Sequence, residues 1–167
     1  MQDYSARIEK DPRDIDAYYQ RGLLYLEDES YRKVLNDGTA ILENDKNNQQ
    51  GYSLVCEANI GLKNELDSYE SCKKAIELQT IHSRAYFYMA NQYKKDRRYK
   101  LAIHNFEKAF LLNPTKVEFI YALAKMYEET NKPKSAKNMY KKVLELEGEH
   151  FDAKKAIVRL NKKISKK

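Results

Sequence analysis

Glycine, cysteine and histidine are scarce in this sequence. The chain of 167 residues has five glycines, two cysteines and three histidines. No stretch matches a glycine-rich phosphate loop or the G-x-S-x-G motif of a serine hydrolase, and no His/Cys cluster has metal-ligand spacing. We therefore predict that the protein is not an enzyme and expect no catalytic residue, metal or cofactor. His82, His104 and His150 are expected at the surface or in turns.

Long apolar runs are also missing. No stretch approaches the roughly 18 apolar residues that a membrane-spanning helix needs. The first residues, MQDYSARIEKDPRD, are charged throughout, which does not fit a secretory signal peptide. The sequence leaves the compartment open, and we favour the cytoplasm.

What the sequence does contain is an internal repeat of 34 residues, which needs no gap. Each repeat can be numbered from place 1 to place 34, and place 8 is then always small. Places 20 and 27 carry small or β-branched residues, and place 11 is tyrosine in three repeats of four. Repeats of this length indicate stacked supersecondary units. Place 1 falls at Ile15, Gln49, Ser83 and Val117, and place 8 at Gly22, Cys56, Ala90 and Ala124.

This pattern resembles the tetratricopeptide repeat (TPR) family, a helix–turn–helix repeat of the same length. The third repeat matches the family by residue class at every signature place, and the resemblance covers residues 15–150. The resemblance implies an all-α fold, a right-handed solenoid of antiparallel helix pairs closed by a C-terminal capping helix. The first repeat departs most from the family pattern, at Arg21, Val34, Gly38, Ile41 and Lys46.

We expect a single domain over residues 1–167. Residues 1–14 look like the remnant of a helix from a preceding repeat. This predicts either that the chain was cut from a longer protein or that a short helical turn replaces the missing unit. The predicted repeats are 15–48, 49–82, 83–116 and 117–150, with helices at 15–27, 31–43, 49–61, 65–77, 83–95, 99–111, 117–129 and 133–145.

The register changes at Phe151, where we predict the capping helix over 151–167. Ala153, Ala156, Ile157, Leu160 and Ile164 form its apolar stripe, and lysines occupy the other side. Such a helix fits the polar end cap that a solenoid requires.

The two cysteines, Cys56 and Cys72, occupy places 8 and 24 of the second repeat. Both places face the helix packing. We predict buried reduced thiols, since free cysteine behaves as a small hydrophobic residue. A disulfide within the repeat is the alternative.

Charge is distributed unevenly along the chain. Residues 1–82 hold 10 Lys/Arg and 16 Asp/Glu, a net charge of −6, and residues 83–167 hold 21 and 9, a net charge of +12. Such a distribution suits a partner of split charge, self-association or an anionic surface at the basic end. The alternative is that it serves solubility alone.

The resemblance places the binding surface in the concave groove, lined by the first helix of each pair. Aromatic side chains recur there, and in the third and fourth repeats they alternate with donors, as anchors for a peptide would. We centre the site on Tyr88, Asn91, Lys95 and Lys125. The full set of predicted groove residues is Tyr19, Arg84, Phe87, Tyr88, Asn91, Lys94, Lys95, Tyr121 and Lys125.

We therefore predict a protein–protein interaction module or scaffold that binds a protein or peptide in this groove. One alternative is nucleic-acid or anionic-surface binding through the basic C-terminal half, whose lysines lack interleaved aromatic residues for base stacking. Another is a structural segment of a larger TPR scaffold or oligomer. The basic residues of the C-terminal helix are Lys154, Lys155, Arg159, Lys162, Lys163, Lys166 and Lys167.

Overall fold

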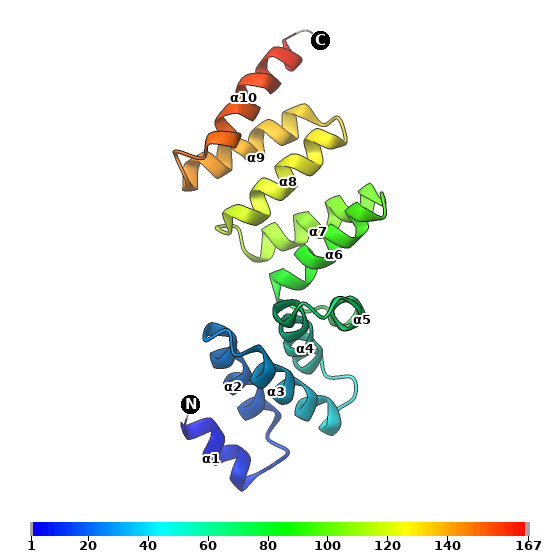
Figure 1. Ribbon diagram of the computed structural model, residues 1–167, viewed down its shortest axis with the longest axis vertical. Coiled ribbons are helices and arrows are strands. Elements are labelled where there is room, and N and C mark those ends of the chain that lie inside the picture. Colours follow the sequence, from blue (N-terminus) through cyan, green and yellow to red (C-terminus); the bar gives the residue numbers. More distant parts are fainter. Residues whose placement is uncertain (1, 166–167) are drawn as a thin grey trace. The chain divides into compact units, whose positions relative to one another are not determined.

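The chain folds entirely into helices over the residues described by the computed structural model, 2–165. Ten helices and no strand occur in this range. They follow one another in the order drawn in Figure 1. Their bounds are α1 Gln2–Lys10, α2 Ile15–Glu27, α3 Tyr31–Asn44, α4 Gln49–Leu62, α5 Glu65–Glu77, α6 Ser83–Lys95, α7 Tyr99–Leu112, α8 Val117–Glu129, α9 Pro133–Leu146 and α10 Phe151–Ile164.

The predicted helix bounds are confirmed to within one residue. Side chains that cap the helices explain why α2 and α4 begin where they do, because capping satisfies backbone N–H groups that lack a partner within the helix. Asp14 accepts a hydrogen bond from the Ala17 N–H, and Asn48 accepts from Gln50 and Gly51. Helix α9 begins with Pro133, whose missing N–H costs nothing in the first turn.

The small places of the repeat are buried, as the 34-residue pattern predicts. At place 8, Ala90 and Ala124 have no exposed surface, and at place 27 the same holds for Ile41, Ala109 and Val143. Small side chains at these places let consecutive helices approach closely while larger ones fill the spaces beside them.

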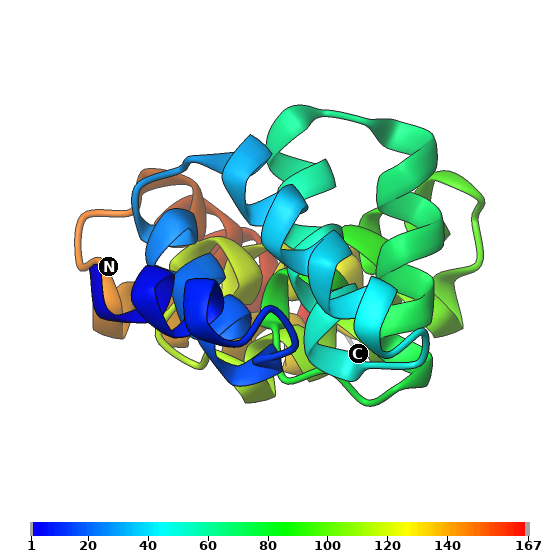
Figure 2. The ribbon, with the colours of Figure 1, turned by 90° about the horizontal axis from the view of Figure 1, so that it is seen from below.

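The chain forms two compact units, Met1–Tyr88 and Met89–Lys167, which divide within α6. In the first unit, α1 lies beside α2, and α3 packs against both α2 and α4 (Figures 1 and 2). Its apolar core includes Val34, Ile41 and Leu54. In the second unit, α7 packs on α8, α8 on α9 and α9 on α10.

The prediction of reduced thiols is wrong. Cys56 in α4 and Cys72 in α5 form a disulfide, and neither cysteine has exposed surface. The residues that α5 buries are otherwise Ser68, Ser71 and Ala75. Since these side chains offer little apolar area, the covalent link supplies part of what a larger core would supply.

The predicted change of register at Phe151 is also wrong. Helix α10 begins 34 residues after α8, at place 1 of a further repeat. Ala153, Ala156 and Leu160 are buried against the core of the fourth repeat, as the predicted apolar stripe requires. Val158, at place 8, is 57% exposed, so α10 presents only the inner half of the pattern to its neighbours. Lys166 and Lys167 lie outside the described residues.

Candidate functional site

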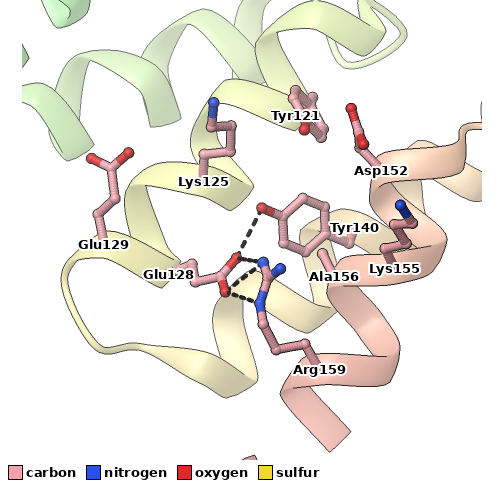
Figure 3. Close-up of a pocket in the computed structure, with 9 residues that line it drawn as sticks. All are labelled: Tyr121, Lys125, Glu128, Glu129, Tyr140, Asp152, Lys155, Ala156 and Arg159. Carbon is pink, nitrogen blue, oxygen red and sulfur yellow. Dashed lines mark hydrogen bonds and ion pairs between the residues drawn. The ribbon is translucent and has the colours of Figure 1, made fainter.

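The second unit carries a pocket of about 310 Å³ between α8 and α10, which we call the α8–α10 pocket. Helix α8 contributes groove places 5, 9, 12 and 13 of its repeat. Helix α10 contributes places 2, 5, 6 and 9 of the next, and a tyrosine of α9 closes the inner end (Figure 3). The pocket is therefore built from the positions that the repeat pattern assigns to the groove. Its lining residues are Tyr121, Lys125, Glu128, Glu129, Tyr140, Asp152, Lys155, Ala156 and Arg159.

Glu128 organises the inner end of the pocket. Its carboxylate accepts hydrogen bonds from Arg159 Nε and Nη2, both at 2.9 Å, and from the Tyr140 hydroxyl at 3.1 Å (Figure 3). The paired geometry fixes α10 against α8, because a guanidinium matches a carboxylate in a defined plane. Burial of the Tyr140 side chain, together with the nearby Glu128 charge, raises the pKa of its hydroxyl, which therefore remains a donor.

Two lysines of the pocket have no ion-pair partner among the described residues. Lys125 Nζ lies 5.8 Å from the centre of the Tyr121 ring, and Lys155 Nζ lies 4.0 Å from that of Phe151. Glu128 is paired with Arg159, and Glu129 with Lys94 at 2.7 Å. With Asp152 as the remaining anion, the unpaired groups carry a net positive charge beside the aromatic ring of Tyr121.

The structure brings some of the predicted groove residues of the second unit together. Tyr121 and Lys125 line the same pocket, and the Tyr121 ring also packs edge-on against Tyr140 at 5.8 Å. Lys94 reaches α8 through its ion pair with Glu129. Lys95 is exposed and Asn91 is half-buried, and neither lines the α8–α10 pocket.

In the first unit, the predicted groove residue Tyr19 is only 9% exposed. Its hydroxyl lies 3.0 Å from His82 Nε2, and His82 Nδ1 lies 3.7 Å from the buried carboxylate of Glu57. Arg84 Nη1 pairs with the same carboxylate at 3.1 Å. Tyr19 and Arg84 thus converge on Glu57.

Two of the predicted groove residues, Phe87 and Tyr88, are half-buried in α6. The Tyr88 hydroxyl donates to the backbone oxygen of Glu65 at 3.0 Å.

The histidines differ in part from the expectation of surface or turn positions. His82 follows the end of α5, as predicted, but its side chain is only 13% exposed because it is enclosed by Tyr19 and Glu57. His150 caps α10 by accepting a hydrogen bond from the Ala153 N–H, and its ring lies 4.8 Å from that of Tyr121. His104 is exposed, as expected.

Sequence analysis missed the part of the pocket that α10 contributes, since it assigned this helix to capping alone. The signal that could have found these residues is the repeat itself. Counting 34 residues on from Val117 places Asp152, Lys155 and Arg159 at groove places 2, 5 and 9.

The described residues contain no cluster of three or more His, Cys, Asp or Glu side chains suited to a metal ion. Within the same part of the chain, no helix is both long and apolar enough to cross a membrane. The pocket can therefore hold a ligand by charge, hydrogen bonding and ring contact.

Comparison with known proteins assigns the family. The model of the tetratricopeptide repeat matches residues 117–150, which are the fourth predicted repeat. The chain is a tetratricopeptide repeat protein. TPR proteins typically mediate protein–protein interactions and are generally non-catalytic scaffolds.

Solved TPR structures share the fold of this chain at low sequence identity. YrrB, described as a TPR protein with an unusual peptide-binding site, is 16% identical. The alignment covers 97% of this chain and 84% of YrrB, with a TM-score of 0.75. PilF of Pseudomonas aeruginosa is 21% identical, covering 93% of this chain and 72% of PilF, with a TM-score of 0.64.

MamA of Desulfovibrio magneticus RS-1, from residue 41 to its end, is also similar to this chain. The two are 21% identical, and the alignment covers 87% of this chain and 81% of that one, with a TM-score of 0.59. At such identities the likeness shows the fold alone.

Proposed function

We propose that this protein is an interaction module that binds a partner protein through an acidic peptide segment seated in the α8–α10 pocket. The observation that carries the proposal is the pair of exposed lysines, Lys125 and Lys155, which line the pocket without an ion-pair partner among the described residues. A carboxylate of the peptide would pair with them, and an apolar neighbour would contact the Tyr121 ring.

The surrounding geometry supports a preformed site. Arg159, Glu128 and Tyr140 satisfy one another at the inner end, so the site need not reorganise to admit a ligand. Preorganisation of this kind lowers the entropic cost of binding. TPR proteins mediate protein–protein interactions, and YrrB is described as binding a peptide. The remaining groove predictions, Tyr19, Arg84, Phe87, Tyr88, Asn91, Lys94 and Lys95, stay predictions.

The experiment is selection of a random peptide library on the wild-type protein, followed by affinity measurement on two charge-reversal variants. Lys125→Glu/Lys155→Glu alters the pocket. Lys134→Glu/Lys141→Glu changes the net charge equally at exposed positions of α9 that do not line it. We expect acidic peptides with apolar neighbours, bound about tenfold more weakly by the pocket variant because two charge pairs of about 1 kcal/mol or less are lost.

Equal affinity of both variants for the selected peptides would contradict the proposal. The same variants test the anionic-surface alternative with a single-stranded oligonucleotide. If binding to the basic half is purely electrostatic, both variants should weaken it equally, and salt should weaken it strongly. Two ion pairs reduce the free charge that α10 offers for such binding, Lys154 with Glu149 and Arg159 with Glu128.

A further inference from the structure

The first unit carries a second pocket, of about 510 Å³, which we call the α3–α5 pocket. It lies on the face of α4 opposite to Glu57. Tyr52, Val55 and Asn59 share one side of this helix at spacings of three and four residues, and Glu57 points to the other side. The pocket is therefore separate from the groove positions. Its lining residues are Leu35, Tyr52, Val55, Asn59, Asp67, Glu70, Ser71 and Lys74.

The pocket coincides with two departures from the repeat. Place 11 is Tyr25, Tyr93 and Tyr127 in the other repeats and Asn59 here. Place 24, which holds the buried rings of Phe106 and Tyr140 in the third and fourth repeats, holds Cys72 here.

The ring at place 11 bridges to the preceding helix pair where it is present. In the fourth repeat the hydroxyl of Tyr127, in α8, donates to Glu107 in α7 at 2.5 Å. The second repeat thus lacks the aromatic volume that these places supply elsewhere. The disulfide joins α4 to α5 and opposes collapse of the space that remains.

The inner end of the pocket presents a hydrogen-bond donor. Asn59 is 3% exposed, and its side-chain oxygen accepts a hydrogen bond from Asn64 Nδ2 at 3.2 Å. Its own Nδ2 has no acceptor among the described residues. No enclosed side-chain nitrogen or oxygen of this part of the chain lacks a partner. The Asn59 nitrogen therefore opens into the pocket that Asn59 lines.

The walls are apolar and the rim is acidic. Leu35 and Val55 are half-buried and line the pocket beside the Tyr52 ring. On the α5 side, the Lys74 ammonium is paired with Glu77 at 3.6 Å, whereas Asp67 and Glu70 have no ion-pair partner among the residues that the structure describes. The unpaired charge at the rim is thus negative.

We propose that the α3–α5 pocket binds a tyrosine side chain of a partner protein, presented next to basic residues. The ring takes the place of the aromatic volume missing from this repeat, and the phenol oxygen accepts from Asn59 Nδ2. Flanking ammonium groups pair with Asp67 and Glu70. Pockets of this size accommodate such groups, with few polar atoms fixing the orientation of a largely apolar ligand.

The test is titration of the oxidised wild-type protein with the peptide acetyl-Gly-Lys-Tyr-Lys-Gly-amide, followed by calorimetry and by amide chemical shifts. The same peptide with phenylalanine in place of tyrosine should bind several-fold more weakly, because Asn59 then loses its acceptor. Tyramine serves as a small-molecule probe of the same chemistry. An affinity for tyramine equal to that for the peptide would overturn the assignment to a protein partner.

Two variants test the pocket itself. Asn59→Tyr supplies the ring that the other repeats carry, so it should abolish binding with the melting temperature unchanged or raised. Glu70→Lys reverses the rim charge and should weaken binding at least tenfold. Its matched control is Glu43→Lys, an exposed position of α3 outside the pocket, which should bind as wild type. Wild-type affinity in Glu70→Lys, or no binding to the wild type at millimolar peptide, would overturn the proposal.

Discussion

At the residue scale, the first repeat departs from the pattern where polar or minimal side chains replace apolar ones. Arg21 stands at place 7, where the other repeats carry Val55, Met89 and Leu123. Its guanidinium bonds to both carboxylate oxygens of Asp37, at 2.6 and 3.1 Å, and Asp37 is almost fully buried. An isolated buried carboxylate would be costly, so the two departures depend on each other.

Gly38, at place 24, allows α3 to approach α4 closely. A Cβ atom there would lie 2.9 Å from Val55 Cγ2 and 3.1 Å from the Val55 backbone nitrogen. We predict that Gly38→Ala lowers the free energy of unfolding by about 1–3 kcal/mol through overpacking, although alanine favours a helix by up to about 1 kcal/mol over glycine. Urea denaturation followed by circular dichroism measures this change.

Gly148→Ala is the matched control. The nearest atom to its added Cβ is the Leu144 backbone oxygen at 3.8 Å, an ordinary contact. The control should change stability by less than about 0.5 kcal/mol. If Gly38→Ala were equally neutral, the close approach of α3 to α4 would be wrong.

At the scale of elements, the sequence predicts the helices well because local and repeat signals agree. Small residues at places 8, 20 and 27, polar turns and one proline locate each helix pair, and α2 to α9 begin and end within a residue of the prediction. Helix α10 obeys the same period, and only the assumption that a cap leaves the register concealed this.

Side-chain partners are predicted less well because they come from other repeats. The sequence places Tyr19 in the groove, but the structure buries it against His82, which lies 63 residues away. Likewise, places 8 and 24 bring Cys56 and Cys72 together, yet spacing alone does not decide between thiols and a disulfide.

The contact between α7 and α8 tests the packing of neighbouring repeats within the second unit. Ala109 has no exposed surface. We predict that Ala109→Leu lowers the free energy of unfolding by about 1–3 kcal/mol, because three additional carbon atoms must enter a filled space. Leu111→Ala, at a position 67% exposed in the same helix, is the control and should be nearly neutral. An unchanged melting temperature for Ala109→Leu would contradict the register of the repeats.

At the scale of the whole molecule, stability in a repeat protein is approximately a sum of repeats and their nearest-neighbour contacts. The disulfide closes a short loop, with 16 residues separating the cysteines, and lies in the repeat whose α5 buries mainly small and polar side chains. A bond that closes a loop of this length contributes about 3 kcal/mol by restricting the unfolded chain.

We therefore predict that reduction with a dithiol acts locally. Amide hydrogen exchange in α4 and α5 should accelerate, by up to about a hundredfold, while exchange in α8 and α9 should not change. Hydrogen-exchange mass spectrometry resolves these segments. The variant Cys56→Ala/Cys72→Ala is the control, since the reductant should not affect it. Uniform acceleration across the chain would show that the molecule opens as one cooperative unit.

The bond between α4 and α5 also means that one sequence specifies two covalent species, which differ by a pair of hydrogen atoms. Disulfides form and persist in oxidising surroundings and are reduced in the cytosol. The redox history of a preparation is therefore part of its chemical identity. Samples purified with and without reductant are different reagents, and partners isolated with one should be tested against the other.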